Sequence, residues 1–192
     1  MKMKCLTRRA GRITLAVLFL AGMLLLGACS GGGQNGAAEQ RDTLAGSLPE
    51  ILAAVLDGAN AALGDTDQLG ASFEDEVTAD SCQGMLGLTP EEFEQYVEGA
   101  YASNAAIITF AHEVALIKCK DFDAAAEVKR LAAAGFDSGK WICVSPDQGY
   151  VIDSGSYVLL VATSTKGADA IRQSFEEAAG GNVGEADVFF EL

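Results

Sequence analysis

The pattern of apolar and polar positions is clearest near the middle of the chain, in the stretch His112–Lys120. Its residues Val114–Ile117 are apolar at four consecutive positions, so a strand formed there has two apolar faces. Asp121-Phe122-Asp123 follows directly, and apolar residues then recur at helical spacing as far as Ala134. The pattern predicts a buried central strand that leads into a crossover helix.

The last third of the chain continues the alternation of strands and helices. Tyr150–Asp153 and Ser156–Ala162 predict a hairpin around a two-residue turn, and its second arm is again apolar on both faces. Apolar residues at helical spacing over Ile171–Ala178 predict the last helix. The alternating residues 186–192 predict an edge strand.

Two capping boxes predict helices ahead of the central strand. Ser47-Leu48-Pro49-Glu50 and Thr89-Pro90-Glu91-Glu92 each combine a capping hydroxyl, a first-turn proline and a glutamate three residues after the cap. Apolar residues then recur at helical steps over 48–63 and over Phe93–Tyr101. Residues 64–88 are rich in glycine and acid, and we expect them to be mostly loop.

From the central strand onward the predicted order is β-α-β-β-α-β, which is the ferredoxin-like pattern. Its first and third strands are central, and these are the two strands predicted to be apolar on both faces. We therefore expect an α+β fold, a ferredoxin-like antiparallel sheet with two additional N-terminal helices. Such a sandwich covers one face of the sheet, so the N-terminal helices, or else a partner protein, are expected to cover the other.

The first 28 residues have the features of an export signal. A basic start without acidic residues precedes the short apolar run Ile13–Leu26. The run ends in Leu26-Gly27-Ala28-Cys29, which resembles the bacterial lipobox. In lipobox proteins the chain is cut before the cysteine, whose thiol is diacylated, with palmitate as one of the acyl groups. A plain signal peptide with an incidental cysteine is the alternative. Arg8-Arg9 hints at twin-arginine export, but the following residues favour ordinary secretion.

Three segments follow from this interpretation. Residues 1–28 are a lipoprotein signal peptide, residues 29–42 a flexible tether rich in glycine and small polar residues, and residues 43–192 a single α+β domain. Two acyl chains give stable anchoring where one is marginal. We therefore expect the domain on the outer face of the cell membrane, held through a diacylglyceryl group on Cys29.

Charge limits the partners of this domain. The chain has 13 basic and 27 acidic residues, and cleavage after residue 28 removes five basic and no acidic ones, which leaves 8 − 27 = −19. Such a surface repels polynucleotides, so no nucleic-acid partner is expected. It serves as a solvated shell or, alternatively, attracts a cationic ligand or metal.

The chain from Cys29 onward contains three further cysteines, at positions 82, 119 and 143. Three is an odd number, so they form at most one internal disulfide, Cys119–Cys143 or Cys82–Cys143, and leave a free thiol. There is no CxxC pair, which gives no indication of a thioredoxin-like or structural zinc site.

Taken together, residues 45–180 resemble a family of small secreted lipoproteins of Gram-positive anaerobes that is catalogued as a domain of unknown function. The resemblance depends on the order and spacing of four segments, which are Gly87–Tyr96, Glu113–Lys118 leading into Asp121, Gly155–Leu160, and Ala168-Asp169-Ala170 with Phe175. It implies an extracytoplasmic lipoprotein and carries no activity, cofactor or catalytic residue.

Four residues are candidates for binding. Glu113 and the only histidine, His112, begin the central strand, where a buried carboxylate can be functionally tuned or can simply pair with a lysine. Trp141 and Tyr157 can line a ligand groove or belong to the core. Phosphate-binding glycine loops, metal-ligand spacings and a nucleophile elbow are absent from the sequence, so no catalytic residue and no cofactor are expected.

The calcium alternative concerns one acidic stretch. Asp65, Asp67, Gly70 and Glu76 fall at positions 1, 3, 6 and 12 of an EF-hand loop, but Leu69 stands where an oxygen ligand belongs. The sequence favours a membrane-anchored, non-enzymatic module that binds another envelope protein or a small ligand. An envelope enzyme that uses Glu113 or His112, or a calcium module, is the alternative.

Overall fold

A computed structural model describes residues 41–65, 67–107 and 109–192 of the chain, and these residues belong to one compact unit. The predicted signal peptide, the lipobox with Cys29 and nearly all of the tether lie outside the described residues. Within the described part, no helix is both long enough and apolar enough to cross a bilayer.

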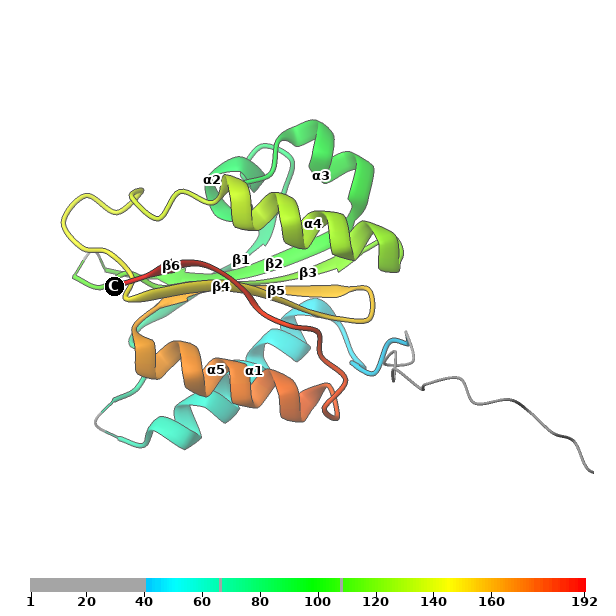
Figure 1. The fold of residues 1–192 in the computed structure, drawn as a ribbon. Helices are drawn as coiled ribbons and strands as arrows, with labels where there is room; N and C mark the ends of the chain where they lie inside the picture. The colour runs from blue at the N-terminus through cyan, green and yellow to red at the C-terminus, as the bar shows by residue number, and fades with distance from the viewer. Residues whose placement is uncertain (1–40, 66, 108) are drawn as a thin grey trace, which may run out of the picture. The chain divides into compact units, whose positions relative to one another are not determined.

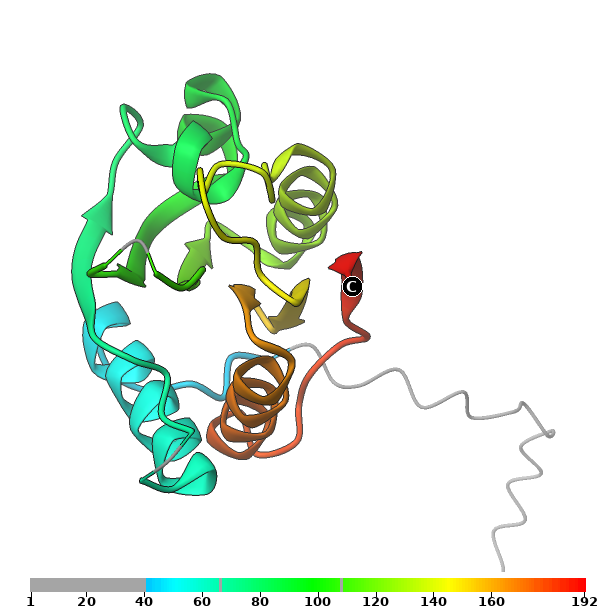
Figure 2. The same ribbon diagram turned by 90° about the vertical axis from the view of Figure 1, so that its left-hand side faces the viewer.

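The core of the fold is a six-stranded sheet in which every neighbouring pair of strands is antiparallel. The strand order is β1-β2-β3-β5-β4-β6, so β3 and β5 lie in the middle (Figures 1 and 2). The strands are β1 (Ser72–Val77), β2 (Val97–Ala105), β3 (Glu113–Cys119), β4 (Gln148–Ser154), β5 (Tyr157–Thr163) and β6 (Asp187–Glu191). The prediction of two central strands without a polar face is confirmed, since β3 and β5 are buried almost throughout.

Helices cover both faces of this sheet. On one face lie α1 (Leu48–Leu63) and α5 (Thr165–Ala178), and on the other lie α2 (Cys82–Leu86), α3 (Pro90–Tyr96) and α4 (Phe122–Gly135) (Figure 1). Successive residues of β3 pack against the helices on opposite faces of the sheet, because side chains along a strand point to the two faces in turn. Leu116 packs against α1 and α5, whereas Ile117 packs against α2 and α4. No partner protein is therefore needed to cover the sheet.

The ferredoxin-like strand order is not confirmed. In that order the last strand lies beside β3, but β2 occupies this place and β6 pairs with the outer side of β4. The unit β3-α4-β4 moves across the sheet from β3 past β5 to β4, and the unit β5-α5-β6 moves from β5 past β4 to β6, so both units advance toward the same edge. Their first strands, β3 and β5, run in opposite directions. Because crossovers are right-handed in nearly all proteins, their helices must lie on opposite faces, as α4 and α5 do (Figure 1).

Both capping boxes are present. The Glu50 carboxylate accepts from the Ser47 backbone N–H at 2.9 Å, and the Glu92 carboxylate accepts from the Thr89 backbone N–H at 2.8 Å. The helix after the second capping box, α3, is nevertheless much shorter than predicted. It ends at Tyr96, and Val97–Ala105 forms strand β2, because pairing with β3 buries these apolar residues better than a free helix would.

The stretch expected to be loop contains β1 and α2. Strand β1 was missed because five of its six residues are exposed, so it lacks the apolar alternation of a half-buried strand. The hairpin of β4 and β5 is confirmed, but its two-residue turn is Gly155-Ser156 and not the predicted Ser154-Gly155, because Ser154 pairs with Tyr157 as the last residue of β4. Strand β6 is confirmed as an edge strand.

Candidate functional site

The polar residues of interest gather at one end of the sheet. At this end β2 finishes with Ala105 and β5 with Thr163, while β3 begins at Glu113 and β4 at Gln148. We call it the loop end, because the 136–147 loop between α4 and β4 and the connection between β2 and β3 both lie there (Figure 1). The opposite end carries the β4–β5 turn.

Glu113 is the central residue of the loop end. It faces the α4 side of the sheet and is only 2% exposed. The Nζ of Lys140, which comes from the 136–147 loop, donates to Glu113 Oε2 and forms an ion pair with it. Lys140 Nζ also donates to the backbone carbonyl of Gly84 in α2 at 2.8 Å, so one ammonium ties the loop to both the sheet and the helical layer.

The Glu113 carboxylate is only half paired. Its Oε1 atom is shielded from solvent and has no hydrogen-bond partner among the described residues. Asn104 is directly opposite Glu113 on the neighbouring strand β2, and its Nδ2 atom is likewise shielded and unpaired within the described part of the chain. An acceptor and a donor without partners therefore occupy adjacent cross-strand positions on one face of the sheet.

Burial controls the protonation of Glu113. Removal of the carboxylate from water raises its pKa from 4.5 to about 7, and the Lys140 ammonium offsets only part of that rise. The carboxyl group therefore changes charge near neutral pH. A buried carboxyl with a strongly shifted pKa is a frequent feature of functional sites, although structural ion pairs share it.

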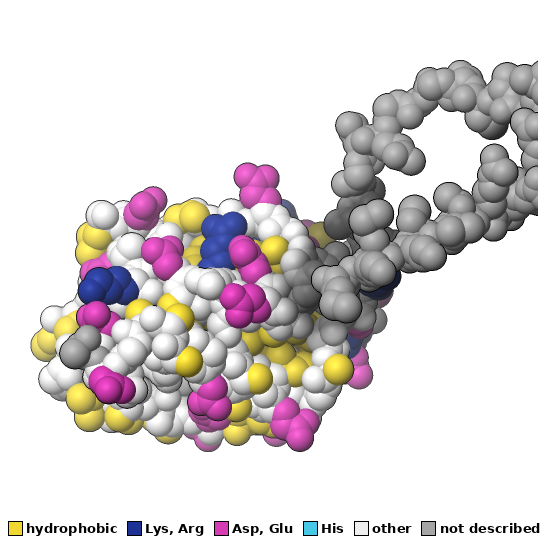
Figure 3. Space-filling model, turned by 90° about the horizontal axis from the view of Figure 1, so that it is seen from below, with side chains coloured by type: hydrophobic (Ala, Val, Ile, Leu, Met, Phe, Trp, Pro, Cys, Tyr) yellow, Lys and Arg dark blue, Asp and Glu magenta, His cyan; other side chains and the backbone are white. Residues whose placement is uncertain are grey.

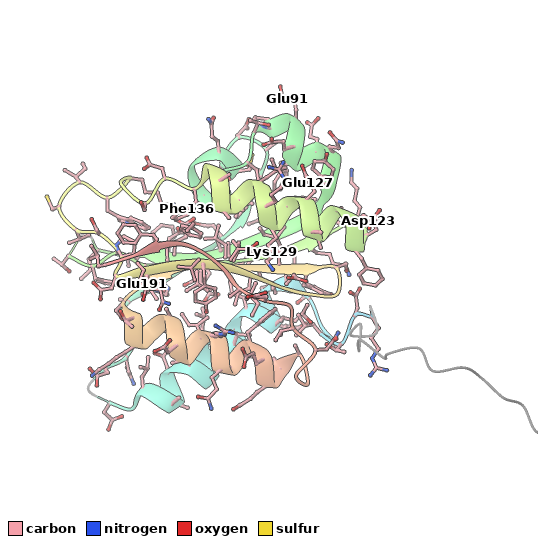
Figure 4. All side chains as sticks on the ribbon, viewed as in Figure 1. Glu91, Asp123, Glu127, Lys129, Phe136 and Glu191 are labelled. Carbon is pink, nitrogen blue, oxygen red and sulfur yellow. The ribbon has the colours of Figure 1, made fainter. Side chains whose placement is uncertain are left out.

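Aromatic rings surround the Lys140 ammonium. Its Nζ lies 4.4 Å from the ring centre of Phe136 and 5.0 Å from that of Trp141, distances that allow cation–π attraction. Figure 4 shows Phe136 where α4 ends and the loop begins. Lys140 and the next three residues, Trp141, Ile142 and Cys143, line a hollow of about 240 Å³. Ile142 is 98% exposed, so the loop presents an apolar tip to solvent.

His112 lies on the other face of the sheet, away from Glu113, because side chains of successive residues point in opposite directions. It is buried, with Nε2 3.4 Å from Ser103 Oγ and Nδ1 3.3 Å from Thr163 Oγ1. Burial lowers its pKa from 6.5 to about 4, so the ring is neutral at pH 7. A hollow of about 110 Å³ adjoins it beside α1. The two polar candidates, neighbours in sequence, thus belong to separate environments.

Tyr157 lies at the end of the sheet opposite the loop end. The Lys118 ammonium is 4.1 Å from its ring centre and donates to the Asp42 carboxylate at 2.5 Å. Asp42 also accepts from the backbone N–H of Ser156 at 2.8 Å. Tyr157 is therefore part of the contact that fixes the start of the domain. Of the four predicted binding residues, only Glu113 and Trp141 are brought together, through Lys140.

The cysteines of the domain are all free. Cys82 and Cys119 are buried and Cys143 is exposed in the 136–147 loop, so neither possible disulfide is formed. The Cys82 thiol donates to the backbone carbonyl of Leu88 at 3.3 Å, and Cys119 contributes to the core on the α4 side.

The acidic stretch does not adopt an EF-hand arrangement. Glu76 lies in strand β1 rather than at the start of a helix, and Leu69 is buried with its N–H donated to Asn60 Oδ1. Asp67 instead forms an exposed ion pair with Lys166 at 3.1 Å. Across residues 41–65, 67–107 and 109–192, no cluster of three or more His, Cys, Asp or Glu side chains is placed to hold a metal ion.

Sequence reasoning missed Asn104 and Lys140. Asn104 has no distinguishing sequence pattern, because the apolar spacing favours helix for part of β2, and only the pairing of β2 with β3 places Asn104 opposite Glu113. Lys140 lies 27 residues from Glu113 in a loop without periodic pattern. The available signal was its position beside Trp141, a polar and an aromatic residue at the end of a helix that packs on the central strand.

The chain matches no known family model, no curated protein and no solved structure. The resemblance to the small lipoprotein family therefore stays a prediction from the sequence, and the site is interpreted from its own geometry.

Proposed function

We propose that this protein is an extracytoplasmic lipoprotein, anchored through Cys29, whose domain binds a partner protein or a small ligand at the loop end without catalysing a reaction. The lipobox, the glycine-rich tether and the acidic composition support the address. The observation that carries the binding role is the half-paired, buried Glu113 beneath a loop whose tip exposes Ile142.

The contacts of Asp42 and Thr43, where the described part of the domain begins, also support binding at the loop end. Asp42 is bonded to Ser156 in the β4–β5 turn, and Thr43 donates its hydroxyl to the carbonyl of Ala179 just after α5. The seven residues of β5 separate the Asp42 contact from the loop end, a distance of about 20 Å at 3.3 Å per residue. The loop end thus lies at the opposite end of the sheet from Asp42, near which the described part of the domain begins.

Coverage of both sheet faces directs the proposal to the loop end. Since helices of the chain itself cover both faces, the large apolar surfaces are already buried. The face made by α1 and α5 carries acidic side chains and a few Lys or Arg side chains scattered among apolar and neutral ones (Figure 3). The separation of Glu113 from His112 by the sheet supports binding over catalysis, because the two cannot act on one bond.

The anchor is tested by the mass of the mature amino terminus. We expect cleavage before Cys29, a diacylglyceryl group on its thiol, and recovery of the protein in the membrane fraction. A Cys29→Ser variant should lose the modification and leave the membrane. An unmodified Cys29 or cleavage at another position contradicts the anchor.

The binding role is tested by photo-crosslinking in cells that produce the full chain. A benzophenone side chain placed at position 142, in the tip of the 136–147 loop, should give a discrete adduct that purified protein competes away. The same group at position 123 is the matched control, because Asp123 is exposed at the start of α4 toward the other end of the sheet (Figure 4). Equal adducts from both positions, or none from position 142, contradict binding at the loop end.

A further inference from the structure

The unpaired atoms at the loop end indicate what the site binds. Glu113 and Asn104 are partners in the register of β3 and β2, so their Cβ atoms lie about 4.5–5.5 Å apart on the same face. Glu113 Oε2 is occupied by the Lys140 ammonium, whereas Glu113 Oε1 and Asn104 Nδ2 have no partner in the described part of the protein. One acceptor and one donor, both shielded from solvent, therefore belong to adjacent positions on the same face of the sheet.

Leaving such groups unpaired is unfavourable. A buried polar atom without a hydrogen bond loses its contacts with water without replacement, so a ligand that satisfies both atoms gains a corresponding advantage. The complementary ligand edge presents an N–H beside a C=O. We propose that the loop end binds a carboxamide group, whose N–H donates to Glu113 Oε1 and whose carbonyl accepts from Asn104 Nδ2. This inference rests on the proposed binding function.

The charges and rings around the site favour an amide over other small polar groups. A carboxylate ligand would place its negative charge against Glu113, and an ammonium ligand would place its charge against Lys140 and leave the Asn104 donor unpaired. An amide is neutral and planar, and the Phe136 and Trp141 rings beside Lys140 offer flat surfaces for it.

Access runs past Lys140. Its side chain is 22% exposed and is shared by the Glu113 pair and the hollow of about 240 Å³ in the 136–147 loop. A ligand that binds Glu113 Oε1 therefore passes the Lys140 ammonium, which keeps its pair with Oε2, and comes close to the Trp141 ring that lies 5.0 Å from that ammonium. Trp141 is the only tryptophan of the chain, so its fluorescence reports this event.

The experiment titrates the full-length chain, held in nonionic detergent at pH 8, and follows Trp141 emission. Acetamide probes a free primary amide and N-methylacetamide probes the peptide group, which distinguishes a small amide ligand from a peptide. N,N-Dimethylacetamide lacks the N–H, sodium acetate carries a charge, and 2-propanol matches acetamide in size. We expect saturable binding of at least one of the two N–H amides in the millimolar range, and none of the other three compounds. Ligands of four or five heavy atoms bind weakly because the binding free energy that each atom can contribute is limited.

Variants assign the response to the site. Asn104→Ala should weaken amide binding at least tenfold, and Asn104→Leu, which keeps the approximate size but removes the donor without adding a charge beside Glu113, should do the same if the alanine variant fails to fold. Ser154→Ala is the matched control, because its hydroxyl is also buried and unpaired within the described residues but lies at the opposite end of the sheet.

Three results would overturn the inference. They are the absence of saturable binding by both N–H amides, equal binding of dimethylacetamide, acetate or 2-propanol, and unchanged amide affinity in both Asn104 variants. None of them affects crosslinking from position 142, so the proposed binding function is judged separately.

Discussion

At the scale of single residues, His112 and Glu113 make opposite contributions to the pH dependence of stability. Burial lowers the pKa of His112 from 6.5 to about 4, so between these values the unfolded chain holds a proton that the folded protein does not. The stability that this group provides is complete above pH 6.5 and is lost as the pH falls. Burial raises the pKa of Glu113 from 4.5 to about 7, so its contribution is complete below pH 4.5 and is lost as the pH rises.

We therefore expect the two effects largely to cancel between pH 4.5 and 6.5, and single variants to separate them. Relative to the parent chain, the free energy of unfolding of Glu113→Gln should rise across this window by about 2–3 kcal/mol, and that of His112→Gln should fall by a similar amount. Urea unfolding followed by circular dichroism at several pH values measures both slopes. Exposed Glu98, replaced by Gln, is the control. Slopes of the same sign for the two variants would refute the assignment.

The ion pair between Glu113 and Lys140 is expected to be energetically coupled. Lys140→Met keeps the aliphatic stem but leaves the buried carboxylate without its cation, which is strongly unfavourable, although the partial exposure of Lys140 moderates the effect. In a Glu113→Gln background the same change should cost much less. A double-mutant cycle from chemical denaturation should give a coupling energy of about 0.5–3 kcal/mol, whereas additive effects would mean that the pair contributes nothing to stability.

Sequence patterns identified some residues of the site and not others, for a physical reason. Glu113 was recognisable because a charged residue directly precedes four apolar ones at the start of a central strand. Asn104 and Lys140 belong to the site only because the fold brings them to Glu113, from which they are 9 and 27 residues away in the sequence. Local periodicity predicts neither proximity. The same limit applies to Tyr157, an aromatic residue whose role at the start of the domain depends on Asp42.

At the scale of elements, the end of α2 packs directly on the end of α4. A Cβ on Gly87 would lie 2.4 Å from the carbonyl carbon of Gly135 and from the nitrogen of Phe136, and Gly87 has a φ of +72°. Two backbones thus touch where α4 passes into the 136–147 loop. The contact fixes the start of the loop that carries Lys140.

Gly87→Ala is accordingly expected to lower the free energy of unfolding by more than the 1–2 kcal/mol that left-handed backbone alone costs a side-chain-bearing residue. It should also alter Trp141 emission in the folded state, because the loop must shift. Gly84→Ala is the matched control: Gly84 lies inside α2, which Gly87 caps, with open space around its Cβ position, and alanine favours helix. Equal destabilisation by both variants in thermal unfolding would show that the Gly87–Gly135 contact has no special role.

Elements with a strong periodic pattern were predictable, and those defined by their neighbours were not. Helix α1 follows from its capping box and apolar stripe. Strand β2 follows helix α3 without a connecting loop, since Tyr96 ends the helix and Val97 begins the strand. The apolar residues there fit both the helical and the strand periodicity. The fold class could be derived from the order of elements, but the place of β6 could not, because either edge of the sheet satisfies its alternating pattern.

At the scale of the whole molecule, the sheet has two open edges, and acidic residues protect one of them. Strand β1 has no neighbour on its outer side in the described strand order, and it carries Glu74, Asp75 and Glu76 in succession beside the half-exposed Phe73. Charges on an edge strand oppose pairing with a second copy. The strong negative charge of the chain adds long-range repulsion, which salt screens.

Neutralising these three residues as Glu74→Gln, Asp75→Asn and Glu76→Gln should therefore produce self-association through β1. Sedimentation velocity of a soluble chain that starts at residue 29 with Cys29→Ser should show a monomeric parent and a dimeric or larger variant at the same concentration. The matched control neutralises three exposed acids of the helical layer, Glu91, Glu94 and Asp123, and so changes the net charge equally. Figure 4 labels Glu91 and Asp123 on this layer. If both variants associate alike, net charge keeps the molecules apart. If only the β1 variant associates, the charges on the β1 edge keep the molecules apart. Addition of salt to the parent chain should then leave it monomeric, because the charges directly on the edge remain.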